Sequence, residues 1–164
     1  MSVRNSAKAI IINGGKVLVN KNLNTLGDMA YGLENGDVYY DLPGGGQNQY
    51  ETLEDAVRRE CLEETGYSVE VIRLCAVFEE ISVHARFRAE YADYAHKIHF
   101  VFLCRLLDKP TGTVTELDID MQGSEWVGVD EIEKLPLYPE LIKVKLASII
   151  ISEYPLYLGA CYVS

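Results

Sequence analysis

Residues 52–66 read TLEDAVRRECLEETG, and the interpretation of the whole chain starts from this segment. Its composition is helical, and Thr52 followed by Asp55 resembles an N-terminal capping box with Asp in place of the usual Glu or Gln. Gly66 stands where a C-cap glycine belongs. The sequence therefore predicts a helix over residues 52–64.

On a helical wheel, the apolar face of this segment turns acidic in its last turn. Leu53, Ala56 and Val57 share one face, and Glu60, Glu63 and Glu64 continue it within an arc of about 100°. Carboxylates at these spacings repel one another, partial burial disfavours each charge, and the helix dipole is negative at this end. A divalent cation relieves all three penalties, because hard cations take carboxylate oxygens as ligands.

The alternative for this face is a solvated acidic surface, which is what most acidic runs on helices are. Here the polar residues Glu54, Asp55 and Arg58 already form a separate polar face. The acidic residues instead extend the apolar stripe, so the pattern favours a metal site.

The flanks of the helix support the same interpretation. Residues 44–46 are three glycines, which let the backbone approach a ligand closely and leave a carbonyl free to complete a cation's shell. Arg59 is next to Glu60 and near Glu63 on the wheel, so its guanidinium can orient a carboxylate through a bidentate contact. Glu51, just before the helix, is the expected partner of Arg59 or a member of a second metal shell.

At this point the segment from Gly45 to Tyr67 resembles the Nudix box in full register. Its seven fixed polar or glycine positions are all filled, by Gly45, Glu51, Arg59, Glu60, Glu63, Glu64 and Gly66. Cys61 and Tyr67 replace the usual aliphatic residues, and Asn48 and Tyr50 stand where an acid and a glycine are common. Weaker similarity extends to residues 16–21, 41–43 and 126–127.

The resemblance implies an α/β fold, a Nudix-like α/β/α sandwich with a mixed β-sheet, forming a single domain over residues 1–164. It implies a metal-dependent pyrophosphohydrolase that cleaves a phosphoanhydride bond of a nucleoside diphosphate linked to another moiety, such as a nucleoside triphosphate or nucleotide derivative. The implied cofactor is Mg²⁺ or Mn²⁺, and the implied partner is a small nucleotide-type substrate.

Carried over residue by residue, the metal ligands would be Glu60, Glu63, Glu64 and the carbonyl of Gly44. The catalytic set would be Glu60, Glu64, Arg59 and Glu51, with Glu51 and Arg59 in support and Glu60 or Glu64 as the base. An acidic loop over residues 109–123 offers further candidates for a ligand or base, namely Glu116, Asp118 and Asp120.

Two other classes of function compete with the hydrolase. A non-catalytic Nudix domain could bind a nucleotide as a sensor, but such modules typically lose box carboxylates and this chain keeps all of them. An isomerase of isoprenoid diphosphates would need a catalytic cysteine and an acid beside the site. Cys61 lies roughly 100° around the helix from Glu60 and is poorly placed for that role.

Substrate recognition is less visible in the sequence. Six tyrosines are candidates for stacking on a base, namely Tyr31, Tyr39, Tyr40, Tyr50, Tyr91 and Tyr94. Arg86 and Arg88 are either phosphate ligands or part of a solvated basic loop. No further motif marks one substrate class.

The rest of the chain alternates strands and helices around this segment. Strands are expected over residues 4–12, 16–20, 38–42, 68–82, 97–107 and 126–129, and an amphipathic helix over 139–153. Asn13-Gly14 predicts a hairpin turn, the glycines at 44–46 are expected to break regular structure, and residues 84–95 read as a loop or short helix. The apolar tail 154–164 is expected either to pack on its own domain or to pair with a second subunit in a homodimer.

Composition and net charge limit the classes of molecule that this protein is expected to bind. The chain of 164 residues is 48% hydrophobic and 24% charged, as in ordinary globular proteins. A net charge of −10 argues against duplex nucleic acid as a partner, whereas bridging metal ions would still allow a phosphorylated small molecule. The four cysteines lack zinc or dithiol spacing, and no signal peptide or membrane segment is evident, so we expect buried thiols and a cytoplasmic protein.

Overall fold

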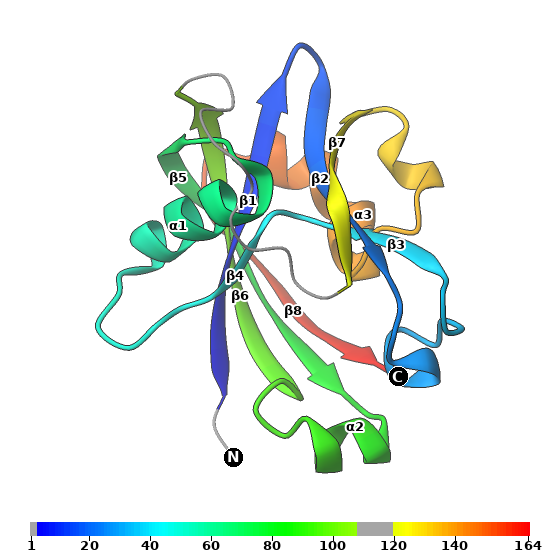
Figure 1. The fold of residues 1–164 in the computed structure, drawn as a ribbon. Coiled ribbons are helices and arrows are strands. Elements are labelled where there is room, and N and C mark those ends of the chain that lie inside the picture. Colours follow the sequence, from blue (N-terminus) through cyan, green and yellow to red (C-terminus); the bar gives the residue numbers. More distant parts are fainter. Residues whose placement is uncertain (1–2, 108–119) are drawn as a thin grey trace.

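The computed structural model describes residues 3–107 and 120–164. Over these residues, eight strands form one mixed sheet with the order β3-β2-β1-β6-β5-β8, to which β4 adds by pairing with β1 and β7 by pairing with β2 (Figure 1). The strands are β1 (Arg4–Asn13), β2 (Lys16–Leu23), β3 (Val38–Asp41), β4 (Gly44–Gly46), β5 (Val69–Ser82), β6 (His96–Leu106), β7 (Met121–Gly128) and β8 (Leu156–Val163). The α-helices are α1 (Leu53–Thr65), α2 (Ala85–Glu90) and α3 (Glu140–Ile151). The predicted α/β class with a mixed sheet is confirmed.

Two apolar cores lie on opposite faces of the sheet, because alternate residues of β1 point in opposite directions. On one face, Ala7 and Ala9 of β1 pack with Val57 and Cys61 of α1. On the other face, Ile10 packs with residues that include Ile142, Leu146 and Ile149 of α3. The sheet therefore lies between α1 and α3, and these two layers hold the sheet from both sides.

Strand β1 changes partner along its length, and this creates the site. Its end pairs with β2 at Ile12↔Val17 and Asn13↔Lys16, whereas its first half pairs with β4 at Ser6↔Gly46 and Lys8↔Gly44. On its other side β1 runs parallel to β6. Because β2 and β4 both lie on one side of β1, the sheet splits there into two branches (Figure 1). Residues of β1, β2 and β4 line a cleft at this split.

The expectation that residues 44–46 break regular structure is wrong. They form β4, antiparallel to β1, because their lack of side chains allows a close approach that other residues could not make. A Cβ on Gly44 would clash with the Ala7 carbonyl oxygen, and one on Gly45 would lie 2.6 Å from Glu60 Oε2.

Other boundaries shift by a few residues. The hairpin after β1 turns at Gly14-Gly15, one residue later than predicted, and both glycines have positive φ as a two-residue hairpin requires. Strands β2 and β7 are longer than expected, and residues 85–90 of the ambiguous segment form α2. The predicted helices over residues 52–64 and 139–153 are confirmed as α1 and α3.

The C-terminal tail forms β8, which pairs parallel with β5 of its own domain. Of the two alternatives for this tail, the structure therefore shows packing on its own domain, and a homodimer stays a prediction. In the described part of the chain, no helix combines the length and apolar character needed to span a membrane.

Candidate active site

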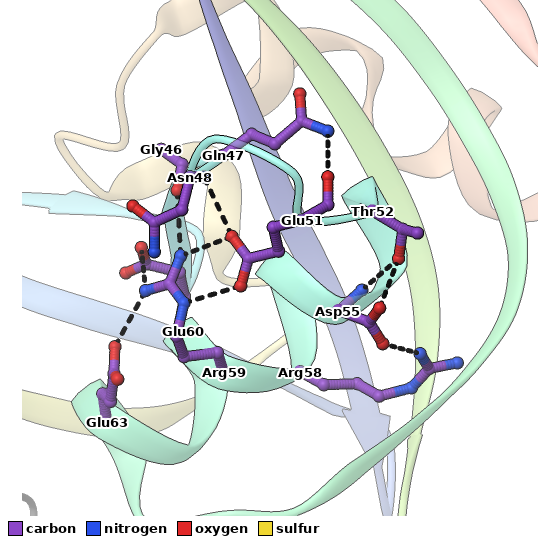
Figure 2. Close-up of polar contacts among 10 residues, drawn as sticks. All are labelled: Gly46, Gln47, Asn48, Glu51, Thr52, Asp55, Arg58, Arg59, Glu60 and Glu63. Atoms are coloured by element: carbon purple, nitrogen blue, oxygen red, sulfur yellow. Dashed lines mark hydrogen bonds and ion pairs between the residues drawn. The ribbon is translucent and has the colours of Figure 1, made fainter.

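Helix α1 is fixed at both ends by the residues that the sequence indicated. The hydroxyl of Thr52 accepts a hydrogen bond from the Asp55 backbone N–H at 3.1 Å, and Gly66 ends the helix with φ of 72°. The capping box is not reciprocal, because the Asp55 carboxylate accepts a 2.7 Å bond from the Thr52 hydroxyl (Figure 2). These caps set where the last turn, with its three glutamates, meets the sheet.

Glu60, Glu63 and Glu64 all line the cleft beside β4. The cleft has a volume of about 350 Å³, and its walls carry both charges. Besides the three glutamates, its lining includes Arg4, Lys8, Asp41, Arg59 and Lys97. Leu62, in the same turn of α1, points away from the sheet and is 43% exposed.

Arg59 binds the carboxylates on either side of it. Its guanidinium donates to both oxygens of Glu51, at 2.8 and 3.0 Å, and to the Gly46 carbonyl at 3.0 Å. It also donates to Glu60 at 2.7 Å and to Glu63 at 3.0 Å (Figure 2). The hydrogen bonds from Arg59 lower the pKa of Glu51. The structure thus brings together Glu51, Arg59, Glu60 and Glu63.

Glu64 lies apart from this network, closer to the sheet. Its carboxylate accepts 2.8 Å hydrogen bonds from the Asn20 side chain and from the Gly44 backbone N–H. Burial raises the pKa of Glu64 to about 7, and nearby Lys8 only partly offsets that rise. The carboxylate is therefore held in place without a cation in direct contact.

Lys8 reaches the same corner from β1. Its ammonium donates to Asp41 at 2.8 Å, to the Leu42 carbonyl at 3.0 Å and to the carbonyl of Gly44. Burial lowers the pKa of Lys8, but Asp41 and the two nearby glutamates outweigh this and raise it above its usual value. The Gly44 carbonyl, a predicted metal ligand, therefore faces the Lys8 ammonium.

Among the residues that the structure describes, no three Asp, Glu, His or Cys side chains are arranged to hold a metal ion. The reason is local, because Glu60 and Glu63 turn toward Arg59 whereas Glu64 turns toward Asn20 and Gly44. The donors are nevertheless hard carboxylate oxygens in one cleft, which is the ligand chemistry that Mg²⁺ and Mn²⁺ prefer. Binding would require Glu60 and Glu63 to leave Arg59.

A second polar cluster lies on β5 and β6, beyond the cleft. Glu80, which is 5% exposed, pairs with Lys97 at 2.8 Å and accepts a 3.3 Å hydrogen bond from the Tyr31 hydroxyl. His99 stacks on Phe78, and its Nε2 lies 3.5 Å from Glu80 without the geometry of a hydrogen bond. These side chains line a cavity of about 60 Å³ that shares Lys8, Asp41, Lys97 and His99 with the cleft.

Sequence reasoning missed the contributions of β1 and β6 to the cleft. Arg4, Ser6 and Lys8 are polar residues at alternate positions of β1, whose residues 9–12 are apolar, and this alternation was the available signal. Lys97 and His99 follow the same alternation on β6. The pattern indicates a polar face, but only the assembled sheet brings these side chains into the same cleft as the glutamates of α1.

Other candidates fall in different places. The Asp120 carboxylate accepts a 2.8 Å hydrogen bond from Thr25, and Glu116 and Asp118 lie outside the described residues. Arg86 pairs with Glu90, and Arg88 donates to the Ser82 carbonyl. Burial raises the pKa of the Cys61 thiol well above its usual value, which disfavours a catalytic thiolate.

The six candidate tyrosines lie in different parts of the structure. Tyr39 and Tyr94 line the cleft, and Tyr31 lines the adjoining cavity, where it stacks on Tyr138. Tyr40 is buried, and Tyr91 stacks on Phe87. Tyr50 is 98% exposed with φ of 67°, a conformation that glycine adopts more readily, which explains why glycine is common at this position.

Comparisons with known proteins converge on one family. The family model described as NUDIX domain matches residues 3–146. An ADP-ribose pyrophosphatase from Streptococcus suis has a TM-score of 0.63 at 20% identity, covering 98% of this chain and 100% of that one. A MutT protein from Bacillus halodurans has a TM-score of 0.65 at 21% identity, covering 98% and 90%.

A UDP-X diphosphatase has a TM-score of 0.63 at 20% identity, covering 96% of this chain and 67% of that one. At these identities the structural likeness establishes the fold alone. The comparison with curated proteins returned no match.

Proposed function

The chain belongs to the NUDIX domain family, and from that premise we propose that it is a metal-dependent pyrophosphohydrolase. The reaction would cleave a phosphoanhydride bond of a nucleoside diphosphate linked to another moiety. The observation that carries the proposal is the placement of Glu60, Glu63 and Glu64 in one cleft, with Arg59 and Glu51 bound behind them.

The proposed cofactor is Mg²⁺ or Mn²⁺, held by Glu60, Glu63, Glu64 and the Gly44 carbonyl. When bound, such a cation neutralises phosphate oxygens and lowers the pKa of a coordinated water. Arg59 forms ion pairs with both Glu60 and Glu63, which limits the mutual repulsion of these two carboxylates. Its bidentate bond to Glu51 keeps the guanidinium in place when those two carboxylates turn away.

A general base is also needed, and Glu60 and Glu64 are both candidates. Two hydrogen bonds orient the Glu64 carboxylate, from Asn20 and from the Gly44 N–H. Glu60 lies against Gly45, where the absence of a side chain leaves room for its carboxylate.

The substrate class is proposed as nucleoside triphosphates or nucleoside diphosphates joined to another group. Support comes from the names of the proteins that share the fold, which include an ADP-ribose pyrophosphatase and a UDP-X diphosphatase. A sensor module that binds nucleotides without cleaving them is the alternative. The complete set of box carboxylates does not favour it.

The deciding experiment is a panel of nucleotides incubated with the protein and Mg²⁺, with products identified by mass spectrometry. The panel should include ADP-ribose, UDP-glucose, a deoxynucleoside triphosphate and a dinucleoside polyphosphate. We expect turnover of at least one compound, lost on chelation of the metal. Absence of turnover with every compound, together with measurable nucleotide binding, would instead establish the sensor.

A further inference from the structure

Arg4 of β1 carries a positive charge that no carboxylate in the cleft neutralises. From this we infer that Arg4 is a substrate-binding residue, which contacts a phosphate of the substrate's diphosphate group directly. The inference deepens the proposed function and rests on it, because it names which side chain of the cleft recognises the anion that the reaction requires.

Four cationic side chains line the cleft, and three of them already have acidic partners. Lys8 pairs with Asp41 at 2.8 Å, Lys97 pairs with Glu80 at 2.8 Å, and Arg59 pairs with Glu51 at 2.8 Å. Among residues 3–107 and 120–164, Arg4 forms no ion pair with a carboxylate, and its guanidinium instead lies over the Tyr94 ring. In a protein with net charge −10, a cleft arginine without an acidic partner is a binding group for an anion from outside.

The position of Arg4 is fixed by packing rather than by charge. Its guanidinium lies against Gly46, where any Cβ would clash with it, and its central carbon is 4.7 Å from the centre of the Tyr94 ring. This slot between a glycine and an aromatic ring restricts the side chain before any ligand arrives. A restricted guanidinium loses less conformational entropy when it binds a phosphate.

The slot is next to the acidic helix. Arg4 approaches β4 at Gly46, and Glu60 approaches it at the neighbouring Gly45 from the other face, while both side chains line the same cleft. Gly46 also accepts the hydrogen bond from Arg59. A diphosphate beside Glu60 therefore has the Arg4 guanidinium within the same cleft, and two parallel N–H groups match two phosphate oxygens.

The competing explanation is structural, since stacking on Tyr94 could serve only to hold residues 91–95 against β1. That role predicts that Arg4 variants lose stability but not affinity for phosphates. Anion recognition predicts the opposite result, with affinity lost and melting temperature nearly kept. The two explanations therefore separate in one set of variants.

The test measures binding of methylenediphosphonate, a diphosphate analogue that cannot be hydrolysed, by calorimetry in the presence of Mg²⁺. For Arg4→Gln we expect the dissociation constant to rise about 10- to 100-fold, and for Arg4→Lys we expect a smaller rise, because the charge remains without the fork geometry. The control is Arg105→Gln. Arg105 is an exposed residue of β6 that pairs with Glu70 of β5, and this variant should bind the analogue as the wild type does.

An Arg4→Gln protein that melts near the wild-type temperature and binds within twofold of it would overturn the inference. So would a wild-type protein that does not bind the analogue. If Arg4→Gln does not fold, Arg4→Lys decides by the same criterion. Binding of the analogue can be measured without turnover. If no compound of the panel is hydrolysed but binding still depends on Arg4, the proposed function is wrong and the inference holds. If the panel is hydrolysed but Arg4→Gln has the KM of the wild type, the proposed function holds and the inference is wrong.

Discussion

Glu64 and Glu80 are both withdrawn from solvent, yet burial affects them in opposite ways. Glu64 accepts hydrogen bonds only from neutral donors, Asn20 and the Gly44 N–H, and its pKa rises to about 7. Burial also opposes ionisation of Glu80, but the Lys97 ammonium and the neighbouring His99 outweigh it, so that its pKa falls below its usual value.

The difference lies in the partner that each carboxylate has within the fold. Glu80 has a permanent cation at 2.8 Å and is complete as the chain folds. Glu64 lies in the cleft with Glu60 and Glu63 and, among the residues that the structure describes, has no cation in direct contact, so Lys8 offsets its burial only in part. Buried ion pairs stabilise structure weakly, whereas an incomplete carboxylate cluster is typical of a binding site.

The largest effect should come from removing the Glu64 charge. Glu64→Gln should lower turnover of any panel substrate at least about 1000-fold, roughly 4 kcal/mol of activation free energy, and leave the metal-free fold as stable or slightly more stable. Steady-state kinetics and urea denaturation measure the two quantities. Glu54→Gln, on the outer face of α1, is the matched control, and near-full activity in Glu64→Gln would refute the metal-site assignment.

Glu80 should respond in stability. Lys97→Met leaves a buried carboxylate without its cation, and the free energy of unfolding should fall by about 3 kcal/mol at pH 7. Chemical denaturation with EDTA present checks this value. Lys145→Met, an exposed residue of α3, should change stability by less than about 0.5 kcal/mol. An equal effect of both substitutions would show that the Glu80 pair is not special.

Metal binding should distinguish the carboxylates of the cleft, represented by Glu63, from the carboxylate of Glu80. At Mg²⁺ about 100-fold above its dissociation constant, the wild type should gain about 2.7 kcal/mol in unfolding free energy. Glu63→Gln should lose most of that gain, whereas Glu80→Gln should keep it even though its starting stability is lower. Thermal melts with and without Mg²⁺ measure the gain, and an equal loss in both variants would contradict the proposed ligand set.

The smallest expected effect is the pH dependence of the metal-free protein. Because the pKa of Glu64 is higher in the folded state than in the unfolded state, the folded state binds more protons, and stability falls as pH rises from about 4.5 through 7. Relative to Glu64→Gln, the wild type should lose on the order of 2 kcal/mol between pH 5 and pH 7. Glu80 has the opposite sign, since its contribution is present above pH 4.5 and is lost in acid. If the free energy of unfolding of wild type and of Glu64→Gln changed with pH in parallel, the predicted difference between Glu64 and Glu80 would be wrong.

Local patterns in the sequence were enough to predict helix α1 and most strands. Thr52, Gly66 and the apolar stripe act within a few residues, so composition and spacing carry the information. Glycines 44–46 were misjudged because their reason is not local. They form a strand since β1 and Glu60 approach too closely for side chains, and both neighbours are distant in sequence.

The same difference between local and distant contacts applies to the residues of the candidate site. Glu51, Arg59 and the three glutamates share one continuous segment, so the sequence alone placed them together. Lys8 and Lys97 enter the site through the register of β1 with β4 and β6, which no local pattern specifies. Arg4 needed one further fact, namely the absence of an acidic partner among the described residues, which only assembled side chains reveal.

The exchange of partners along β1 has a consequence for folding. The cleft exists only after β1 has met β4 on one edge and β6 on the other, and both contacts close long loops. Such pairings form late and slowly compared with a helix such as α1. A nascent or partly unfolded chain would therefore carry the acidic helix but no competent cleft, and activity regained during refolding would report the completed sheet rather than the helix.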